Sequence, residues 1–308
     1  MSSLPLAHSR VWLGLKTLGG REKTEMLKPS LELIEIKTDT EPLVGLLYRP
    51  PEGFVDPSAG QRCAVLFHGN TMNFYSGALR FLPPRLVSMG YTCLAFNRRG
   101  HDILTTRNSR APEGGAFQST AQAIEDNELA VAYLRSLNLP APVVIGHSNG
   151  GMLAVEFVSK HPETPGMVLL SAHRGGEGLL PDASSSGLLA CDQLQSITEK
   201  AVALVEAGKG QALIQLPGWW WVISAQSFLD LTKTLPDTLA LAPSIQCPTL
   251  FLVGDSEPTS RYPAQAFAEK TQGHCTVAVI EGCDHFYNSR ESQVSDEVCR
   301  WLKDTLDA

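Results

Sequence analysis

Residues 146–150, Gly-His-Ser-Asn-Gly, place one serine between two glycines. The apolar run at 142–145 is typical of a buried strand, and residues 149–160 have the pattern of a helix. Glycines permit a sharp turn from a strand into a helix, and this turn presents the serine hydroxyl at the edge of the sheet. A solvated serine in a glycine-rich turn is the simpler alternative, but the flanking strand and helix favour Ser148 as a nucleophile.

A serine hydroxyl is a weak nucleophile unless a neighbouring base takes its proton. His285 is the best candidate for this base, because it lies between the last predicted strand, 276–280, and the closing helix, 289–306. His147 belongs to the turn around Ser148 and is expected to point away from it.

The base in turn needs a carboxylate that orients it. The turn after the predicted strand 249–253 offers two, Asp255 and Glu257, in the sequence Gly-Asp-Ser-Glu-Pro at 254–258. We predict Glu257 as the acid, because it is the third residue after the glycine, and we keep Asp255 as the alternative. The chain order is then serine, acid, histidine.

Two backbone amides are predicted to stabilise the negative charge that develops on the attacked carbonyl oxygen. One is the amide of Asn149, at the start of a helix whose first N–H groups have no partner within the helix. The other is expected from the loop His-Gly-Asn-Thr at 68–71, which follows the apolar strand 63–67. Asn70 is the predicted donor there and Thr71 the neighbouring alternative. Each such amide commonly contributes about 3 kcal/mol.

Short β-like runs alternate with helical stretches from residue 31 onward, which predicts a mostly parallel sheet covered by helices on both sides. The expected strands are 31–36, 43–48, 63–67, 92–96, 142–145, 167–170, 249–253 and 276–280. The expected helices are 76–89, 119–137, 149–160, 262–271 and 289–306, the first interrupted at Pro83 and Pro84.

Residues 172–245 break this alternation, and they are too many for a plain connection. A Gly- and Ser-rich stretch opens the segment, and helical patterns follow at 190–208 and 222–234. We therefore predict a helical lid inserted after the sixth strand. The predicted division is an N-terminal leader or helix at 1–30, a core at 31–171 and 246–308, and the lid at 172–245.

Three adjacent tryptophans, Trp219, Trp220 and Trp221, lie in the middle of the predicted lid. They cannot all face one side of a helix, so one or two of them are expected to line a substrate pocket. Anchoring of the lid to the core is an equal alternative. Phe286, beside His285, is a further candidate for the pocket wall. Such side chains favour a moderately hydrophobic substrate over a highly charged one.

The composition limits the possible partners. The chain has 308 residues, 43% of them hydrophobic, and a net charge of −7 at pH 7. This charge, without any basic stretch interleaved with aromatics, argues against nucleic acid or an anionic membrane as the main partner. No apolar segment reaches the ~18 residues of a membrane span. We therefore expect a small-molecule substrate.

The cysteines bear on metals and on location. All seven are scattered and form no Cys-x-x-Cys pair, which argues against a zinc ribbon or a disulfide framework. We find no motif for a metal or an organic cofactor and predict neither. We expect a cytoplasmic protein, although Arg10, Lys16 and Arg21 precede the first acidic residue, Glu22, and leave a transit segment as the weaker alternative. The composition indicates no oligomeric state.

The chain resembles the α/β-hydrolase superfamily, in order, over about residues 31–306. The motifs that carry the resemblance are the turn at 146–150, His-Gly at 68–69, Phe-Asn-Arg-Arg-Gly-His at 96–101, the turn at 254–258 and Asp-His at 284–285. This resemblance implies an eight-stranded sheet and acyl-enzyme chemistry. Two residues depart from the common pattern, since Glu257 and Asn97 stand where many members carry Asp.

The resemblance implies hydrolysis of a carboxylic ester, lactone or thioester through an acyl-enzyme on Ser148. Within catalysis, the alternatives are C–C bond hydrolysis, a lyase reaction or acyl transfer with the same three side chains. A ligand-binding receptor built on a hydrolase frame is the alternative from another class. The presence of serine, acid and histidine together argues against that receptor.

Overall fold

The structure, a computed structural model, describes residues 29–306 apart from 52, 54–59, 107–109 and 219–220. Nearly all of the predicted leader, together with Trp219 and Trp220, therefore lies outside the described residues. Along the described part of the chain, no helix combines the length and the apolar character needed to cross a membrane.

One sheet of eight strands forms the centre of the molecule, in the order β1-β2-β4-β3-β5-β6-β9-β10. Its strands are β1 (Ser30–Ile36), β2 (Leu43–Arg49), β3 (Arg62–Phe67), β4 (Tyr91–Phe96), β5 (Val143–His147), β6 (Met167–Leu170), β9 (Thr249–Gly254) and β10 (Cys275–Ile280). The pairs β1–β2 and β2–β4 are antiparallel, and the other pairs are parallel. The predicted fold class, a mostly parallel eight-stranded α/β sheet, is confirmed.

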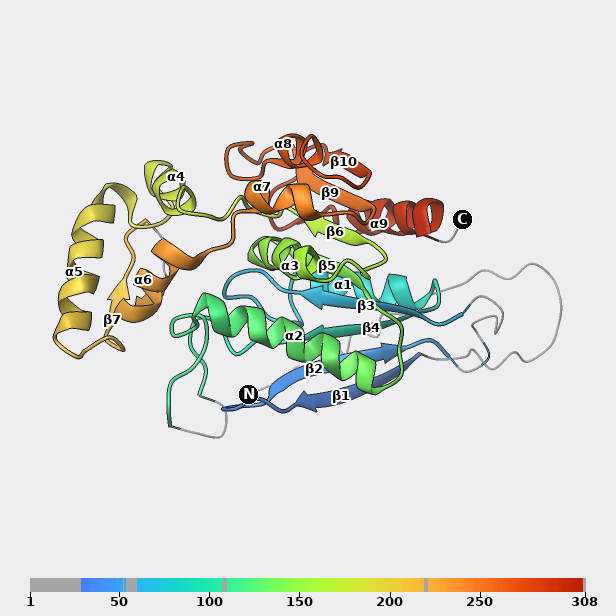
Figure 1. The fold of residues 1–308 in the computed structure, drawn as a ribbon, viewed down its shortest axis with the longest axis horizontal. Coiled ribbons are helices and arrows are strands. Elements are labelled where there is room, and N and C mark those ends of the chain that lie inside the picture. The colour runs from blue at the N-terminus through green and yellow to red at the C-terminus, as the bar shows by residue number, and fades with distance from the viewer. Residues whose placement is uncertain (1–28, 52, 54–59, 107–109, 219–220, 307–308) are drawn as a thin grey trace, which may run out of the picture.

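Helices cover both faces of the sheet, as Figure 1 shows. They are α1 (Ala78–Val87), α2 (Thr120–Ser136), α3 (Asn149–Lys160), α8 (Ala264–Ala268) and α9 (Glu291–Leu306). One apolar core packs α2, α3 and α8 against one face, and a second core packs α1 and α9 against the other. Since both faces are covered, a strand such as β4 is buried along its whole length, which explains its continuous apolar sequence.

The predicted interruption at Pro83 and Pro84 is wrong, because α1 runs through both prolines. The N–H of Ser88 still donates to Pro84 O at 3.3 Å, so the helical bonding resumes after them. Leucines on the inner side of α1 are buried against the sheet, and this packing outweighs the two missing amide donors.

Residues 172–245, called the insert below, connect β6 to β9. The elements in this segment are α4 (Leu179–Ser185), η2 (Cys191–Gln193), α5 (Leu194–Glu206), β7 (Leu213–Gln215), β8 (Val222–Ser224), α6 (Ala225–Thr234), α7 (Thr238–Leu241) and η3 (Ala242–Ser244). Figure 1 shows α4, α5, α6 and β7 grouped at one end of the sheet. The insert has its own apolar core, which includes Ile197, Trp221 and Phe228.

Two features of the insert differ from the sequence-based prediction. The helix expected at 222–234 begins with strand β8, which pairs with β7 in a small antiparallel hairpin. The end of the insert packs against the central sheet and its helices, because Ala242 and Ile245 belong to the apolar core that α2, α3 and α8 form with the sheet. Ser224 N–H donates to Ala116 O at 2.7 Å, and this bond fastens the hairpin to the loop before α2.

Candidate active site

Ser148 occupies a sharp turn between β5 and α3. Its backbone has φ 55° and ψ −118°, and its N–H donates to Leu170 O of β6 at 2.9 Å. A Cβ added to Gly146 would lie 2.3 Å from Gly150 O, and one added to Gly150 would lie 2.1 Å from Phe67 O. Only glycine fits these two close approaches, so the two glycines force the turn that exposes Ser148.

His285 lies next to Ser148, although 137 residues separate them in the chain. His285 Nε2 is 2.9 Å from Ser148 Oγ. The loop after β10 that carries His285 is shaped by Asp284, whose side chain accepts bonds from the amides of Phe286 and Asn288 at 3.0 and 3.1 Å. The structure thus brings the predicted base and the predicted nucleophile within hydrogen-bonding distance.

Glu257 lies on the other side of the His285 ring. Its Oε1 is 2.6 Å from His285 Nδ1, and its side chain is only 3% exposed. Asp255 instead accepts bonds from the amides of Gly282 and Cys283 at 3.0 and 3.2 Å. These two amide bonds lower the pKa of the Asp255 carboxyl. Of the two carboxylates in the turn, the structure therefore places Glu257 beside the histidine and gives Asp255 a role in joining two loops.

The second oxygen of Glu257 is held by groups that the sequence did not indicate. Glu257 Oε2 accepts from Gly254 N–H at 2.8 Å and from Ser171 Oγ at 2.5 Å. Ser171 Oγ is also 2.6 Å from Tyr287 Oη, and both residues are fully buried. Burial, followed by the nearby Glu257 charge, raises the pKa of Tyr287 well above its usual range, so the phenol stays protonated.

His147 was expected to point away from Ser148, but its ring contacts the loop that carries His285. Its Nε2 is 2.9 Å from His285 O, and the two rings lie 5.0 Å apart. Burial, followed by the charge of His285, lowers the pKa of His147 to about 3. A neutral His147 donates from Nε2 to the carbonyl of His285 and so supports the loop that carries the base.

The loop after β3 lines the same pocket as Ser148, His285 and Glu257. His68 Nε2 accepts from Arg98 N–H at 3.0 Å, so Nδ1 carries the hydrogen and donates to Gly69 O at 2.7 Å. Asn70, Thr71 and Asn149 all line the same pocket as Ser148. Asn149 is the first residue of α3, where amides lack partners within the helix. The structure thus brings the predicted oxyanion loop and the start of α3 together around the serine.

The pocket in front of Ser148 has a volume of about 500 Å³. The insert contributes an apolar wall of six leucines and one tryptophan: Leu179, Leu180, Leu188, Leu189, Leu231, Leu235 and Trp221. Phe286 and Tyr262, from the central part of the chain, also line the pocket, and the Tyr262 ring lies 4.9 Å from that of His285. The predicted wall candidates Trp221 and Phe286 are therefore both on the pocket, whereas Trp219 and Trp220 lie outside the described residues.

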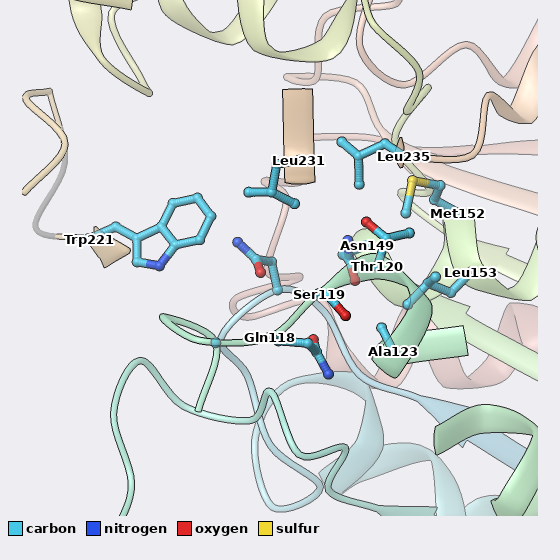
Figure 2. Close-up of a pocket in the computed structure, with 12 residues that line it drawn as sticks. Gln118, Ser119, Thr120, Ala123, Asn149, Met152, Leu153, Trp221, Leu231 and Leu235 are labelled. Carbon is cyan, nitrogen blue, oxygen red and sulfur yellow. The ribbon is translucent and has the colours of Figure 1, made fainter. Parts of the chain in front are cut away.

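A small recess opens from the pocket beyond Asn149, between the start of α2 and the insert. Figure 2 shows Gln118, Ser119 and Thr120 on one side of it and Leu231 and Leu235 on the other. Its volume of about 20 Å³ is enough for one water molecule. The recess is therefore a polar extension of a mainly apolar pocket.

Sequence reasoning missed Ser171, Tyr287 and His173 as parts of this site. Ser171 directly follows the strand 167–170, and Tyr287 lies two residues after His285, so both occupy the edge where the other site residues were expected. That position was a usable signal. The bonds between them join residues 116 apart in the chain, and no local pattern indicates such a pairing.

A model of the alpha/beta hydrolase family matches residues 64–299. The chain belongs to this family, and the membership supports a hydrolase activity. No curated protein matches the chain in sequence.

Several solved structures share the fold. The chain is 15% identical to Est1E from Butyrivibrio proteoclasticus with bound ferulic acid, with a TM-score of 0.68 over 89% of this chain and 100% of that one. It is 15% identical to the alpha/beta hydrolase GrgF from Penicillium sp. sh18, with a TM-score of 0.62 over 91% and 100%. It is 17% identical to the esterase Pf2001 from Pyrococcus furiosus, with a TM-score of 0.58 over 94% and 98%. Similarity at these identities shows the fold alone.

Proposed function

We propose that the chain is a serine hydrolase that cleaves a carboxylic ester, lactone or thioester through an acyl-enzyme on Ser148. The observation that carries this proposal is the hydrogen-bonded line from Ser148 Oγ to His285 Nε2 and from His285 Nδ1 to Glu257 Oε1, at 2.9 and 2.6 Å. This arrangement supplies a nucleophile, a base and a group that orients the base, which are the parts that acyl transfer needs.

The reaction has two steps in this proposal. Ser148 Oγ attacks the carbonyl carbon while its proton passes to His285 Nε2, and the Asn149 and Asn70 amides hold the oxyanion. The imidazolium then gives the proton to the leaving alcohol or thiol. In the second step a water gives a proton to His285 Nε2 and attacks the acyl carbon. The bond from that carbon to Ser148 Oγ then breaks, Ser148 Oγ takes the proton back from His285, and the carboxylic acid leaves. Glu257 stabilises the imidazolium in both steps.

The pocket favours a neutral, mainly apolar acyl group. Its charged side chains already have partners. Glu257 bonds to His285, Arg261 Nε bonds to Asp182 at 2.8 Å, and Asp284 accepts from the amides of Phe286 and Asn288. Burial, followed by the charges of His285 and Arg261, lowers the pKa of His173 on the same wall to about 3. A neutral His173 can hydrogen-bond a keto or hydroxyl group on an otherwise apolar chain, but it carries no positive charge to form an ion pair with a substrate carboxylate.

Labelling with a fluorophosphonate tests the nucleophile. We expect Ser148→Ala to abolish labelling and to lower ester turnover by about 10⁴-fold or more. Ser159→Ala is the matched control, because Ser159 lies on the same helix and its hydroxyl bonds only to Glu156 O among the described residues. Labelling of the Ser148→Ala variant at the wild-type rate would disprove the assignment.

Substrate panels separate this reaction from the alternatives. The proposal expects steady-state release of acid from aryl esters or thioesters. Preferential turnover of diketones or cyanohydrins would instead indicate C–C cleavage or a lyase reaction. A single slow acylation without turnover would indicate a receptor built on the same frame.

A further inference from the structure

Arg98 is a buried cation directly behind the proposed oxyanion hole. It follows β4 and is 1% exposed, the largest of the fully buried side chains among the described residues. Burying a guanidinium costs free energy unless neighbouring groups compensate. Burial accordingly lowers the pKa of Arg98 to about 10, which still leaves the group charged at neutral pH.

The bonds of Arg98 join the two segments that carry the proposed oxyanion donors. Its Nη2 donates to His68 O at 2.6 Å, in the loop that leads to Asn70. The same nitrogen lies 3.4 Å from the side-chain oxygen of Asn149. One terminal nitrogen of the guanidinium thus bridges the loop after β3 and the first residue of α3.

The charge of Arg98 is not neutralised by a direct ion pair. Among the described residues, no carboxylate lies within 4.0 Å of its nitrogens, and its Nε and Nη1 are buried without a hydrogen-bond partner. Asp126 is the acidic side chain whose charge acts on the pKa of Arg98 against the effect of burial. Its carboxylate bonds instead to Arg99, at 2.7 Å from Nε and 2.8 Å from the amide. The surplus positive charge therefore faces the Ser148 side of the sheet through His68 and Asn149.

We propose that Arg98 is a positioning residue of the oxyanion hole, which fixes the Asn70 loop against Asn149 and favours negative charge on the substrate oxygen. This inference rests on the proposed acyl-enzyme function. A charge that develops only in the transition state gains from a fixed cation, whereas a neutral ground-state carbonyl gains little. Arg98 should therefore act on kcat and leave the apparent binding of the substrate nearly unchanged.

Two variants separate the charge from the bonds. Arg98→Met removes both, whereas Arg98→Lys keeps a cation of similar length. With 4-nitrophenyl butyrate as the probe, we expect Arg98→Met to lower kcat by about 10- to 100-fold with KM within about threefold of wild type. Arg98→Lys should retain more of kcat than Arg98→Met. Arg135→Met, which removes an exposed arginine paired with Glu163, is the control.

A transition-state analogue gives a readout that a merely structural role would not move. Ser148 Oγ attacks the carbonyl carbon of an alkyl trifluoromethyl ketone while its proton passes to His285 Nε2, and the π electrons of the carbonyl move to the oxygen, which becomes an oxyanion. Arg98→Met should weaken inhibition by this ketone by the same factor as kcat. Inhibition by the matching methyl ketone, which stays neutral, should remain within about threefold.

The outcomes are distinct. If Arg98→Met is folded and leaves both kcat and the trifluoromethyl ketone constant within threefold of wild type, the inference is wrong. Equal weakening of both ketones would also overturn it. If Arg98→Met does not fold, Arg98→Lys is compared with the neutral Arg98→Gln, and equal kcat values would overturn it. Absence of fluorophosphonate labelling in the wild type would instead reject the proposed function, and this inference with it.

Discussion

The two sides of the pocket are built by different means. Ser148, Glu257 and His285 lie on short loops that follow parallel strands, and backbone bonds fix each loop, such as Ser148 N–H to Leu170 O at 2.9 Å. The other side comes from the insert, where Trp221 belongs to a separate apolar core and Leu189 and Leu231 pack against that core. Chemistry at the first side requires distances between reacting groups that are correct to within a few tenths of an ångström. The second side only has to be apolar and of suitable size.

This difference determines which substitutions each side of the pocket tolerates. A change on the loop side moves reacting atoms and should act on kcat. A change on the insert side alters the volume available to the acyl chain and should act on KM and on the choice of substrate. The predictions below test this division.

After the loss of Ser148 itself, the largest effect is expected at the acid. Glu257→Gln keeps the shape of the side chain but removes the charge that stabilises the imidazolium, so turnover should fall by about 10³- to 10⁴-fold. Asp255→Asn is the matched change in the same turn. It should cost less than about tenfold because, in the described part of the chain, the Asp255 carboxylate bonds only to backbone amides and Ser256. Steady-state kinetics on one aryl ester compare the two, and a larger loss in Asp255→Asn would reverse the assignment.

The second prediction compares a glycine on each side. Gly150→Ala places a Cβ 2.1 Å from Phe67 O and should lower the free energy of unfolding by about 3 kcal/mol or more. Gly210→Ala, in the insert, meets its nearest atom at 3.4 Å and should change it by less than about 1 kcal/mol. Urea unfolding measures both. Equal stabilities would contradict the tight packing of the turn around Ser148.

Acid should destabilise the native protein through three buried histidines, two on the loop side and His173 at the start of the insert. Burial is the main reason that the pKa of His68 falls well below 6.5 and that the pKa values of His147 and His173 fall to about 3. Below pH 6.5 the unfolded chain takes up protons at these imidazoles and the native chain does not. This contribution to stability is therefore present above pH 6.5 and is lost as the pH falls towards 3.

At pH 5 His147 and His173 should each cost about 2 kcal/mol of unfolding free energy relative to neutral pH. Urea unfolding at pH 7.5 and pH 5.0 measures the total loss. His173→Leu should reduce this loss by about 2 kcal/mol, since its imidazole is then absent. An unchanged pH dependence in this variant would show that His173 does not stay neutral in the native state.

The smallest effect is expected on the insert side. Leu180→Ala enlarges the pocket and should raise KM for a long-chain aryl ester by about 3- to 10-fold, with kcat within about twofold. The acetate ester should be unaffected. Leu213→Ala is the control, because Leu213 is exposed on β7 and does not line the pocket. A drop in kcat for both esters would contradict the assignment of the insert side to substrate binding alone.

The sequence predicted the loop side better than the insert side, for a physical reason. Continuous apolar runs such as 63–67 identify strands buried on both faces, and glycines mark turns whose geometry excludes side chains. The choice between Glu257 and Asp255 could not be settled from one turn, because it depends on the amides of Gly282 and Cys283, which lie 27 and 28 residues away.

The insert was harder to predict. Strand β8 has only three residues, which is too short for a pattern of alternating side chains to be recognised, and it continues directly into α6. Its strand geometry comes from pairing with β7 and from the bond between Ser224 and Ala116. Tertiary contacts of this kind leave no local signal, and the helix predicted at 222–234 therefore began too early.

The hydroxyl of Ser171 sets a direction for the protons behind the histidine. A serine hydroxyl has one hydrogen, and Ser171 gives it to Glu257 Oε2, so Tyr287 must be the donor in the bond between Tyr287 and Ser171. Every hydrogen along this line therefore points towards the carboxylate. A proton that His285 receives from Ser148 cannot be passed inwards along it, and it can leave only from Nε2, on the side where the substrate is proposed to bind.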